Sequence, residues 1–188
     1  MFYCPKKQNA ACVVIPVMLG VIGITAIGFS FYYPHLSYPV IYQVLAVICL
    51  VFAVQIASRY ALSVPMYELT DPKEPEHPCG LLRVDFEQGR RKKRQCELEL
   101  TTAVALIPKE QAAQWEREHQ KPHTIFKYQR NLFAKDAYRL YAQAEEATIA
   151  LDLEISDERF YPLLAQRISD SGKTPPVPPE TEAPDLTA

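Results

Sequence analysis

Hydrophobic residues are distributed unevenly along the chain. No Asp, Glu, Lys or Arg occurs from Gln8 to Ser58, and two long apolar runs, 10–33 and 40–62, flank the segment 34–39. A helix of about 20 apolar residues crosses the hydrocarbon core of a bilayer, which is about 30 Å thick. The pattern therefore predicts two transmembrane helices joined by an external turn at 34–39.

Two other structures also contain long apolar runs. A cleaved signal peptide has an apolar core of about 7–15 residues before a small-residue cleavage site, but the first run is longer and a second run follows it. A helical hairpin buried in a soluble protein carries a polar face at helical spacing. Neither run has such a face, so the pattern favours a transmembrane hairpin.

Basic residues at the ends of the runs predict the orientation. Lys6 and Lys7 precede the first run, Arg59 lies near the end of the second, and the turn has no Lys or Arg. Because cytoplasmic flanks carry an excess of Lys and Arg, we expect the N-terminal residues 1–9 and the chain after 62 in the cytoplasm, at the inner (plasma) membrane. Tyr60 and Tyr67 are expected at the cytoplasmic headgroup level, where amphipathic rings are enriched.

After residue 62 the apolar positions change to a period of two. Two alternating runs on either side of Gly89 predict a β-hairpin with one buried face and a tip at 88–94; their apolar members are Leu82, Val84, Phe86, Cys96, Leu98 and Leu100. Further strands are expected at 124–130, 137–143 and 148–154, with a short helix at 109–119. On the last strand, Ile149, Leu151 and Leu153 are expected on one face and Ala150, Asp152 and Glu154 on the other.

The end of the domain and the tail differ in composition. A final amphipathic helix is predicted after Asp157, with its apolar stripe formed by Phe160, Leu163, Leu164 and Ile168. Residues 71–78 form a proline-rich loop. Residues 171–188 contain five prolines and no aromatic residue, so this tail is expected to be disordered. The folded domain is therefore expected at 63–170.

Charge becomes informative only when it is read by position. The formal net charge is −2, and all 22 acidic residues lie at or after Glu68. The domain at 63–170 has more acidic than basic residues, which argues against a broad basic surface for nucleic acid. The chain is therefore expected to have no nucleic-acid partner.

No catalytic or metal-binding motif is present. The chain has six glycines and neither a phosphate-binding loop, a nucleophile elbow nor a zinc-protease motif. The five cysteines, which include Cys4 and Cys12, form no C-x-x-C pair and are expected to be reduced thiols. Palmitoylation of these two is an alternative to their packing as small apolar residues. We expect no enzymatic activity, no cofactor and no bound metal.

The strongest local signal is a run of cations at the predicted hairpin tip, formed by Arg90, Arg91, Lys92, Lys93 and Arg94. Near a membrane, such a cluster attracts anionic headgroups with about 1 kcal/mol per residue. The alternative is a solvated turn that its charge keeps soluble. These five residues are the candidate lipid-binding residues.

The order of elements resembles that of a pleckstrin-homology-like (PH-like) domain. The resemblance lies in the segments LLRVDFEQGRRKKRQCELEL, HTIFKYQRNLFAKDAYRLYAQ and ATIALDLEISDERFYPLLAQRI. Two membrane helices followed directly by such a domain resemble bacterial membrane proteins with PH-like cytoplasmic modules. The resemblance implies an antiparallel β-barrel or bent sheet that a C-terminal α-helix plugs, and lipid binding through a basic hairpin. The helix at 109–119 departs from a minimal PH-like module.

Together these features predict an α+β membrane protein: an N-terminal transmembrane helical hairpin followed by a PH-like β-domain. We expect a non-catalytic binding or scaffolding domain at the inner membrane surface, with the lipid bilayer, anionic headgroups or another membrane protein as partners. The alternative function is that of an accessory subunit in a membrane transport or envelope-maintenance complex, acting through the transmembrane helices.

Overall fold

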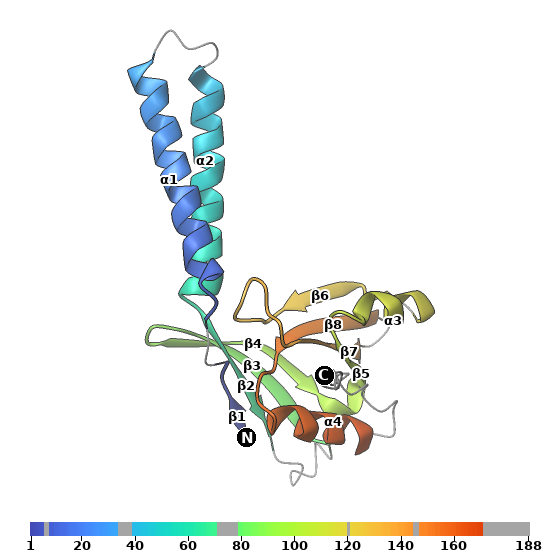
Figure 1. Cartoon of the computed structure of the whole chain (residues 1–188). Coiled ribbons are helices and arrows are strands. Elements are labelled where there is room, and N and C mark those ends of the chain that lie inside the picture. Colours follow the sequence, from blue (N-terminus) through green and yellow to red (C-terminus); the bar gives the residue numbers. More distant parts are fainter. Residues whose placement is uncertain (6–7, 34–38, 71–78, 120, 145–146, 171–188) are drawn as a thin grey trace, which may run out of the picture.

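The computed structural model describes residues 1–5, 8–33, 39–70, 79–119, 121–144 and 147–170 (Figure 1). The predictions for Lys6 and Lys7, for the loop 71–78 and for the tail 171–188 lie outside the described residues. So does the predicted turn, except for Pro39, which begins the second helix.

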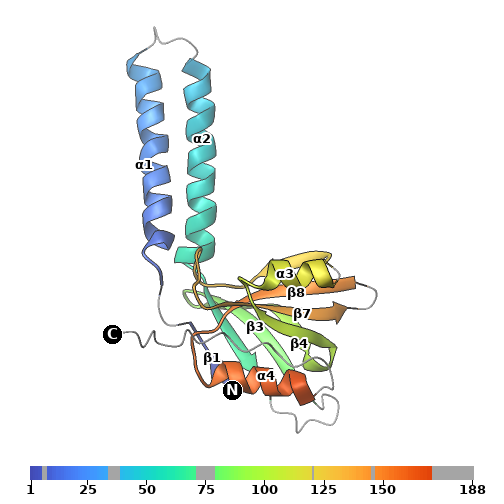
Figure 2. The same ribbon diagram turned by 45° about the vertical axis from the view of Figure 1, so that its right-hand side comes forward.

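Two long helices form an antiparallel pair that projects from the rest of the protein (Figures 1 and 2). They are α1 (Ala11–Tyr32) and α2 (Pro39–Ile56), and the π-helical turn η1 (Ala57–Ala61) continues α2. Both are long and apolar enough to cross a membrane. Only 17% and 6% of their most apolar windows are buried, whereas the core helix of a soluble protein is mostly buried.

The two helices touch at a glycine and at a polar pair. A Cβ atom at Gly23 would lie 3.0 Å from Leu50 Cγ and 3.1 Å from the carbonyl oxygen of Ala46. Near the end of the pair that is far from the domain, Gln43 Nε2 donates a hydrogen bond to Ser30 Oγ over 3.0 Å. The absence of a side chain at position 23 therefore sets how closely the helices approach.

The remainder of the chain forms two four-stranded sheets and two helices. The first sheet has the order β1-β2-β3-β4 and is antiparallel throughout. Its strands are β1 (Phe2–Tyr3), β2 (Val64–Leu69), β3 (Leu81–Gln88) and β4 (Arg91–Glu99). The second sheet has the order β5-β7-β8-β6, with strands β5 (Ala103–Pro108), β6 (Thr124–Lys127), β7 (Ala137–Ala144) and β8 (Ala147–Glu154). The short 3-10 helix η2 (Leu100–Thr102) leads from one sheet to the other.

The second sheet is mixed, not antiparallel as predicted. Strands β5 and β8 both pair antiparallel with β7, while β6 pairs parallel with β8. Strands β5 and β6 therefore run in the same direction from opposite edges of the sheet. Such a connection needs a crossover segment, usually a helix, and α3 (Ala112–Glu118) lies in that segment.

The core lies between the two sheets, and α4 (Phe160–Asp170) covers one end of it (Figure 2). It combines side chains of both sheets with Phe160, Leu164 and Ile168 of α4, three of the four residues of the predicted stripe; the fourth, Leu163, is partly buried and packs against this core. The two sheets are not joined edge to edge in the described residues, so no closed barrel forms. The α+β class is confirmed, whereas the barrel alternative is wrong because η2 takes the chain out of the first sheet.

The first residues belong to the domain and not to a separate N-terminal tail. Strand β1 pairs with β2, and the Tyr3 ring stacks on Phe160 and Tyr67 at centroid distances of 5.2 and 5.9 Å. The Tyr3 hydroxyl also accepts a hydrogen bond from Ser156 N over 2.8 Å. Tyr67, which the sequence suggests at the headgroup level, is fully buried in this cluster. It faces inward because alternate residues of β2 pack into the core.

This packing predicts that Tyr3, although it precedes α1 in the chain, stabilises the domain that follows α2. Truncating a large buried aromatic residue costs about 3–5 kcal/mol, so Tyr3→Ala should lower the free energy of unfolding by about that amount. Phe2→Ala is the matched control, because Phe2 is 63% exposed and exposed substitutions change stability by about 0.5 kcal/mol or less. Urea unfolding of the full chain in a neutral detergent, followed by near-UV circular dichroism, measures both. Equal losses in the two variants would contradict the packing of β1.

The contact at Gly23 predicts a position-dependent effect of adding a side chain to α1. Gly23→Leu should destabilise the helix pair by about 1–3 kcal/mol, the usual cost of overpacking, because Leu50 and the backbone of α2 occupy that space. Gly20→Leu should be neutral, because nothing lies within 4 Å of a Cβ atom there. Unfolding by titration with SDS, with helix separation followed by fluorescence transfer, distinguishes the two. A neutral Gly23→Leu variant would rule out this interface.

Candidate functional site

The five cations of the basic run do not all lie at the tip of the hairpin. Gly89 and Arg90 form the turn, with Gly89 at a φ of +60°, and the other four cations belong to strand β4. The predicted tip at 88–94 is therefore too long. Residues 91–94 extend the ladder because they pair with 85–88 of β3.

An irregularity in β4 decides which way these cations point. Arg94 pairs with Asp85 and Cys96 pairs with Val84, so Gln95 is an extra residue in the ladder. A regular strand would place Lys92 and Arg94 on the same face as Cys96 and Leu98. The bulge reverses this relation, and Arg91 and Lys93 share the face of Gln88 and Phe86, their cross-strand partners.

The cations on the outer face of the hairpin are neutralised. The Asp85 carboxylate is only 4% exposed and lies 3.0 Å from Lys92 Nζ and 3.4 Å from Arg94 Nε. Arg94 also pairs with Glu97 at 3.1 Å. Lys92 and Arg94 therefore form ion pairs within the hairpin itself.

The cations on the other face line a hollow with Arg59. This basic pocket, defined by Arg59, Arg91 and Lys93, has a volume of ≈ 590 Å³. Its remaining lining residues are neutral: Ser58, Ser63, Phe86, Gln88, Gln95 and Tyr128. Within the described part of the chain, no carboxylate lies within 4.0 Å of the Arg91 or Lys93 side-chain nitrogens.

Arg59 is held in place from two sides. Its guanidinium carbon lies 4.1 Å from the centre of the Phe86 ring, and its Nη2 donates a hydrogen bond to the carbonyl oxygen of Lys127. Such cation–π contact is favourable and leaves the other guanidinium N–H groups to bind further acceptors. Beside it, burial raises the pKa of Tyr128 to about 12, so this phenol is neutral at physiological pH.

The basic pocket lies where the helices meet the domain. Ser58 and Arg59 come from η1, and the β3–β4 hairpin passes beside that end of the helix pair (Figure 1). The sequence identifies Arg91 and Lys93 as candidates. It does not indicate that Arg59, treated there as an orientation signal, joins them, because only the fold brings residues so distant in sequence together.

A larger hollow of ≈ 770 Å³ has a different character. Its lining mixes Lys135 and Arg159 with Asp136, Asp157 and Glu158. The buried Glu154 carboxylate at its base already accepts hydrogen bonds from Asn131 N at 2.9 Å and Arg130 N at 3.0 Å, and another from Asn131 Nδ2. This carboxylate therefore holds the 130–131 backbone in place.

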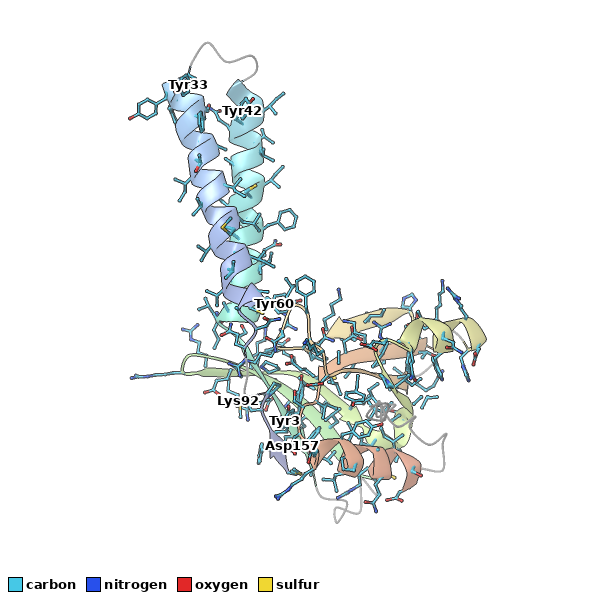
Figure 3. The ribbon with its side chains drawn as sticks, in the orientation of Figure 1. Tyr3, Tyr33, Tyr42, Tyr60, Lys92 and Asp157 are labelled. Atoms are coloured by element: carbon cyan, nitrogen blue, oxygen red, sulfur yellow. The ribbon has the colours of Figure 1, made fainter. Side chains whose placement is uncertain are left out.

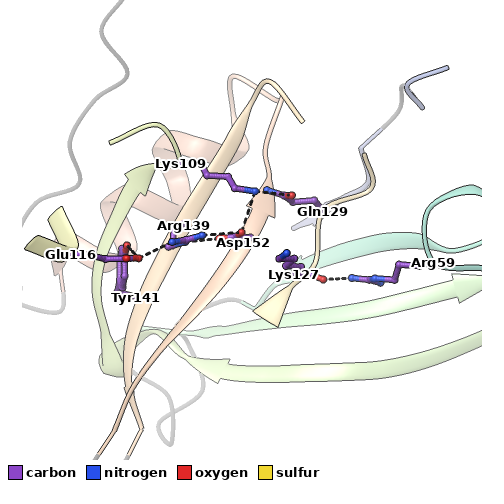
Figure 4. Close-up of polar contacts among 8 residues, drawn as sticks. All are labelled: Arg59, Lys109, Glu116, Lys127, Gln129, Arg139, Tyr141 and Asp152. Atoms are coloured by element: carbon purple, nitrogen blue, oxygen red, sulfur yellow. Dashed lines mark hydrogen bonds and ion pairs between the residues drawn. The ribbon is translucent and has the colours of Figure 1, made fainter. Parts of the chain in front are cut away.

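A second buried acid anchors α3 to the sheet (Figure 4). Asp152 is fully buried and binds Arg139 through both oxygens, at 2.7 and 3.2 Å, and Lys109 at 3.3 Å. Arg139 also donates a hydrogen bond to the Glu116 carboxylate at 2.7 Å. The same carboxylate accepts a hydrogen bond from the Tyr141 hydroxyl at 3.0 Å. The sequence places Asp152 on the face of β8 opposite the core, which is correct, but that face is covered by the crossover segment.

The described residues contain no cluster of three His, Cys, Asp or Glu side chains that would hold a metal ion, and all five cysteines are free. Comparisons with protein-family models, with curated proteins and with solved structures found no match to this chain.

The division of the run predicts that its two pairs of cations differ in their effect on stability. Lys92→Gln/Arg94→Gln removes both cationic partners of the Asp85 carboxylate, and an unsatisfied buried acceptor costs about 1–3 kcal/mol. Arg91→Gln/Lys93→Gln, with the same change in charge, should alter stability by about 0.5 kcal/mol or less. Urea unfolding in neutral detergent compares the pairs, and adding Asp85→Asn to the first should restore part of the loss. Equal effects of the two pairs would contradict the assignment of faces.

Proposed function

We propose that this chain is a membrane-anchored, non-catalytic binding protein whose basic pocket holds the phosphate of an anionic lipid headgroup. The observation that carries the proposal is the convergence of Arg59, Arg91 and Lys93 around a pocket without carboxylates, at the end of two helices that are long and apolar enough to span a membrane.

The side chains of the helix pair support membrane insertion, as its length does. Its outer surface is largely apolar and exposed, and aromatic rings lie at both ends: Tyr33 and Tyr42 far from the domain and Tyr60 beside it (Figure 3). Tyrosines are enriched at the two interfaces of a bilayer because their rings are amphipathic. In this orientation the basic pocket lies at the headgroup level of one leaflet.

The residue types of the pocket suit a phosphate group. An arginine guanidinium donates parallel hydrogen bonds to phosphate oxygens, and a lysine ammonium adds a point charge. Hydroxyl and amide groups of Ser58, Ser63 and Gln95 line the same hollow and supply further donors. None of the described residues that line the pocket carries a carboxylate, so an anion meets no repulsion from them.

The proposal includes the orientation and the kind of domain. Both ends of the chain lie in the cytoplasm at the inner membrane, as the basic flanks of the helices favour. The β-domain acts as a PH-like binding module, and its attachment to the helices raises its effective concentration toward lipids of that leaflet.

This function predicts that lipid binding depends on Arg91 and Lys93 and not on Lys92 and Arg94. Each cation near an anionic surface contributes about 1 kcal/mol, so Arg91→Gln/Lys93→Gln should weaken phosphatidylglycerol binding about 10- to 30-fold. Phosphatidylglycerol titrated into neutral-detergent micelles of the full chain, read by native mass spectrometry, gives the affinity, with phosphatidylcholine as the uncharged comparison.

The matched control carries the same charge change on the same strand. Lys92→Gln/Arg94→Gln should keep phosphatidylglycerol affinity within about twofold under conditions where the domain is folded, since surface charges beyond direct contact are screened by salt. Equal weakening by both pairs would show attraction by net charge alone. Unchanged affinity in the Arg91→Gln/Lys93→Gln variant would exclude the basic pocket as the binding site.

A further inference from the structure

Strand β6 and the residues after it expose an unusual amount of apolar surface. Phe133 is 65% exposed, Phe126 41% and Ile125 40%. In the described residues outside α1 and α2, the other large apolar side chains with such exposure are Met1, Phe2, Tyr33 and Leu62. We refer to residues 124–136 as the β6 segment.

Contacts with both helices set the position of the β6 segment. Leu132 N donates to Cys12 Sγ at 3.4 Å, and the Asn131 side chain accepts from Asn9 N. Cys12 lies in the first turn of α1 and is fully buried by this contact, which supports packing over lipidation for this cysteine. The carbonyl of Lys127 meets Arg59 of η1, so the segment touches the domain-side ends of both apolar helices.

We propose that the β6 segment is a membrane-contacting surface, with Phe126 and Phe133 in the interfacial layer of the leaflet and Lys127 and Lys135 among its phosphates. The inference rests on the proposed membrane insertion of α1 and α2 but not on the basic pocket. Since α1 becomes continuously apolar from its first turn, that turn marks the edge of the hydrocarbon core. Phe133 follows Leu132, which binds this turn, and therefore lies at the same depth.

The bilayer is the occupant that these observations favour. The segment contacts the domain-side ends of both helices, whose exposed apolar outer surface lipid covers in the proposed orientation. Exposed apolar patches mark interaction sites, and aromatic rings flanked by basic side chains are typical of membrane interfaces. Lys127 and Lys135 are both exposed beside the aromatic residues.

The experiment measures the depth of single added tryptophans. Phe133→Trp, Phe2→Trp and Val21→Trp are made separately in the full chain, where Trp115 provides the baseline emission. Phe2 is 63% exposed, close to Phe133, but lies on β1 beside the end of β2 that is remote from the helices; Val21 is 55% exposed on α1. Each variant is reconstituted into vesicles of phosphatidylcholine brominated either near the headgroup or near the acyl-chain end.

The inference predicts strong quenching of the added tryptophan in Phe133→Trp by the lipid brominated near the headgroup, at least threefold above that in Phe2→Trp. Val21→Trp should be quenched more by bromine near the chain end. Quenching of Val21→Trp without quenching of Phe133→Trp overturns this inference and leaves the proposed function intact. Absence of quenching in Val21→Trp overturns membrane insertion, and with it both proposals. Because phosphatidylcholine has no net charge, the result does not depend on the basic pocket.

Discussion

The structure depends on the fact that a helical hairpin returns the chain to the end at which it entered. The residues before α1 and after α2 consequently emerge side by side, and they pair as β1 and β2 at the edge of the first sheet. Tyr3 and Tyr67 face the same core from these two strands and meet Phe160 of α4 there. The strands on both sides of the helix pair thus contribute side chains to the hydrophobic core of the domain, which fixes the helices to it at two points.

The same junction explains the position of the basic pocket. Arg59 lies two helical positions before the end of η1, and β2 begins at Val64, so the hairpin that pairs with β2 passes close to the helix end. The bulge at Gln95 then separates two electrostatic roles on one strand. Asp85 draws Lys92 and Arg94 to the outer face, and Arg91 and Lys93 remain beside Arg59 without a described carboxylate partner.

Features that depend on one segment could be predicted from the sequence. The two long helices follow from apolar length alone, and the alternation around Gly89 and the stripe of α4 follow from periodicity. Features that depend on contacts between segments could not. The strand β1 is two residues long, too short to show any periodicity. The face of β4 on which each cation lies depends on one extra residue, Gln95. Tyr67 and Asp152 have residue types typical of interfaces and surfaces, and only the packing of β1 and of the crossover segment buries them.

These connections also bear on what a lipid contact would achieve. Only Leu62 and Ser63 lie between η1 and β2, so the domain is not suspended on a flexible linker whose reach would grow with its length. Insertion of two apolar helices is effectively irreversible compared with the binding of a headgroup, so in the proposed orientation the basic pocket would not be needed to bring the domain to the membrane. The binding free energy of a headgroup in the pocket, a few kilocalories per mole, would instead select which lipid surrounds the helix ends, or hold the domain at one tilt. In the proposed orientation, loss of the pocket would therefore change the bound lipid and leave the localisation of the protein unchanged.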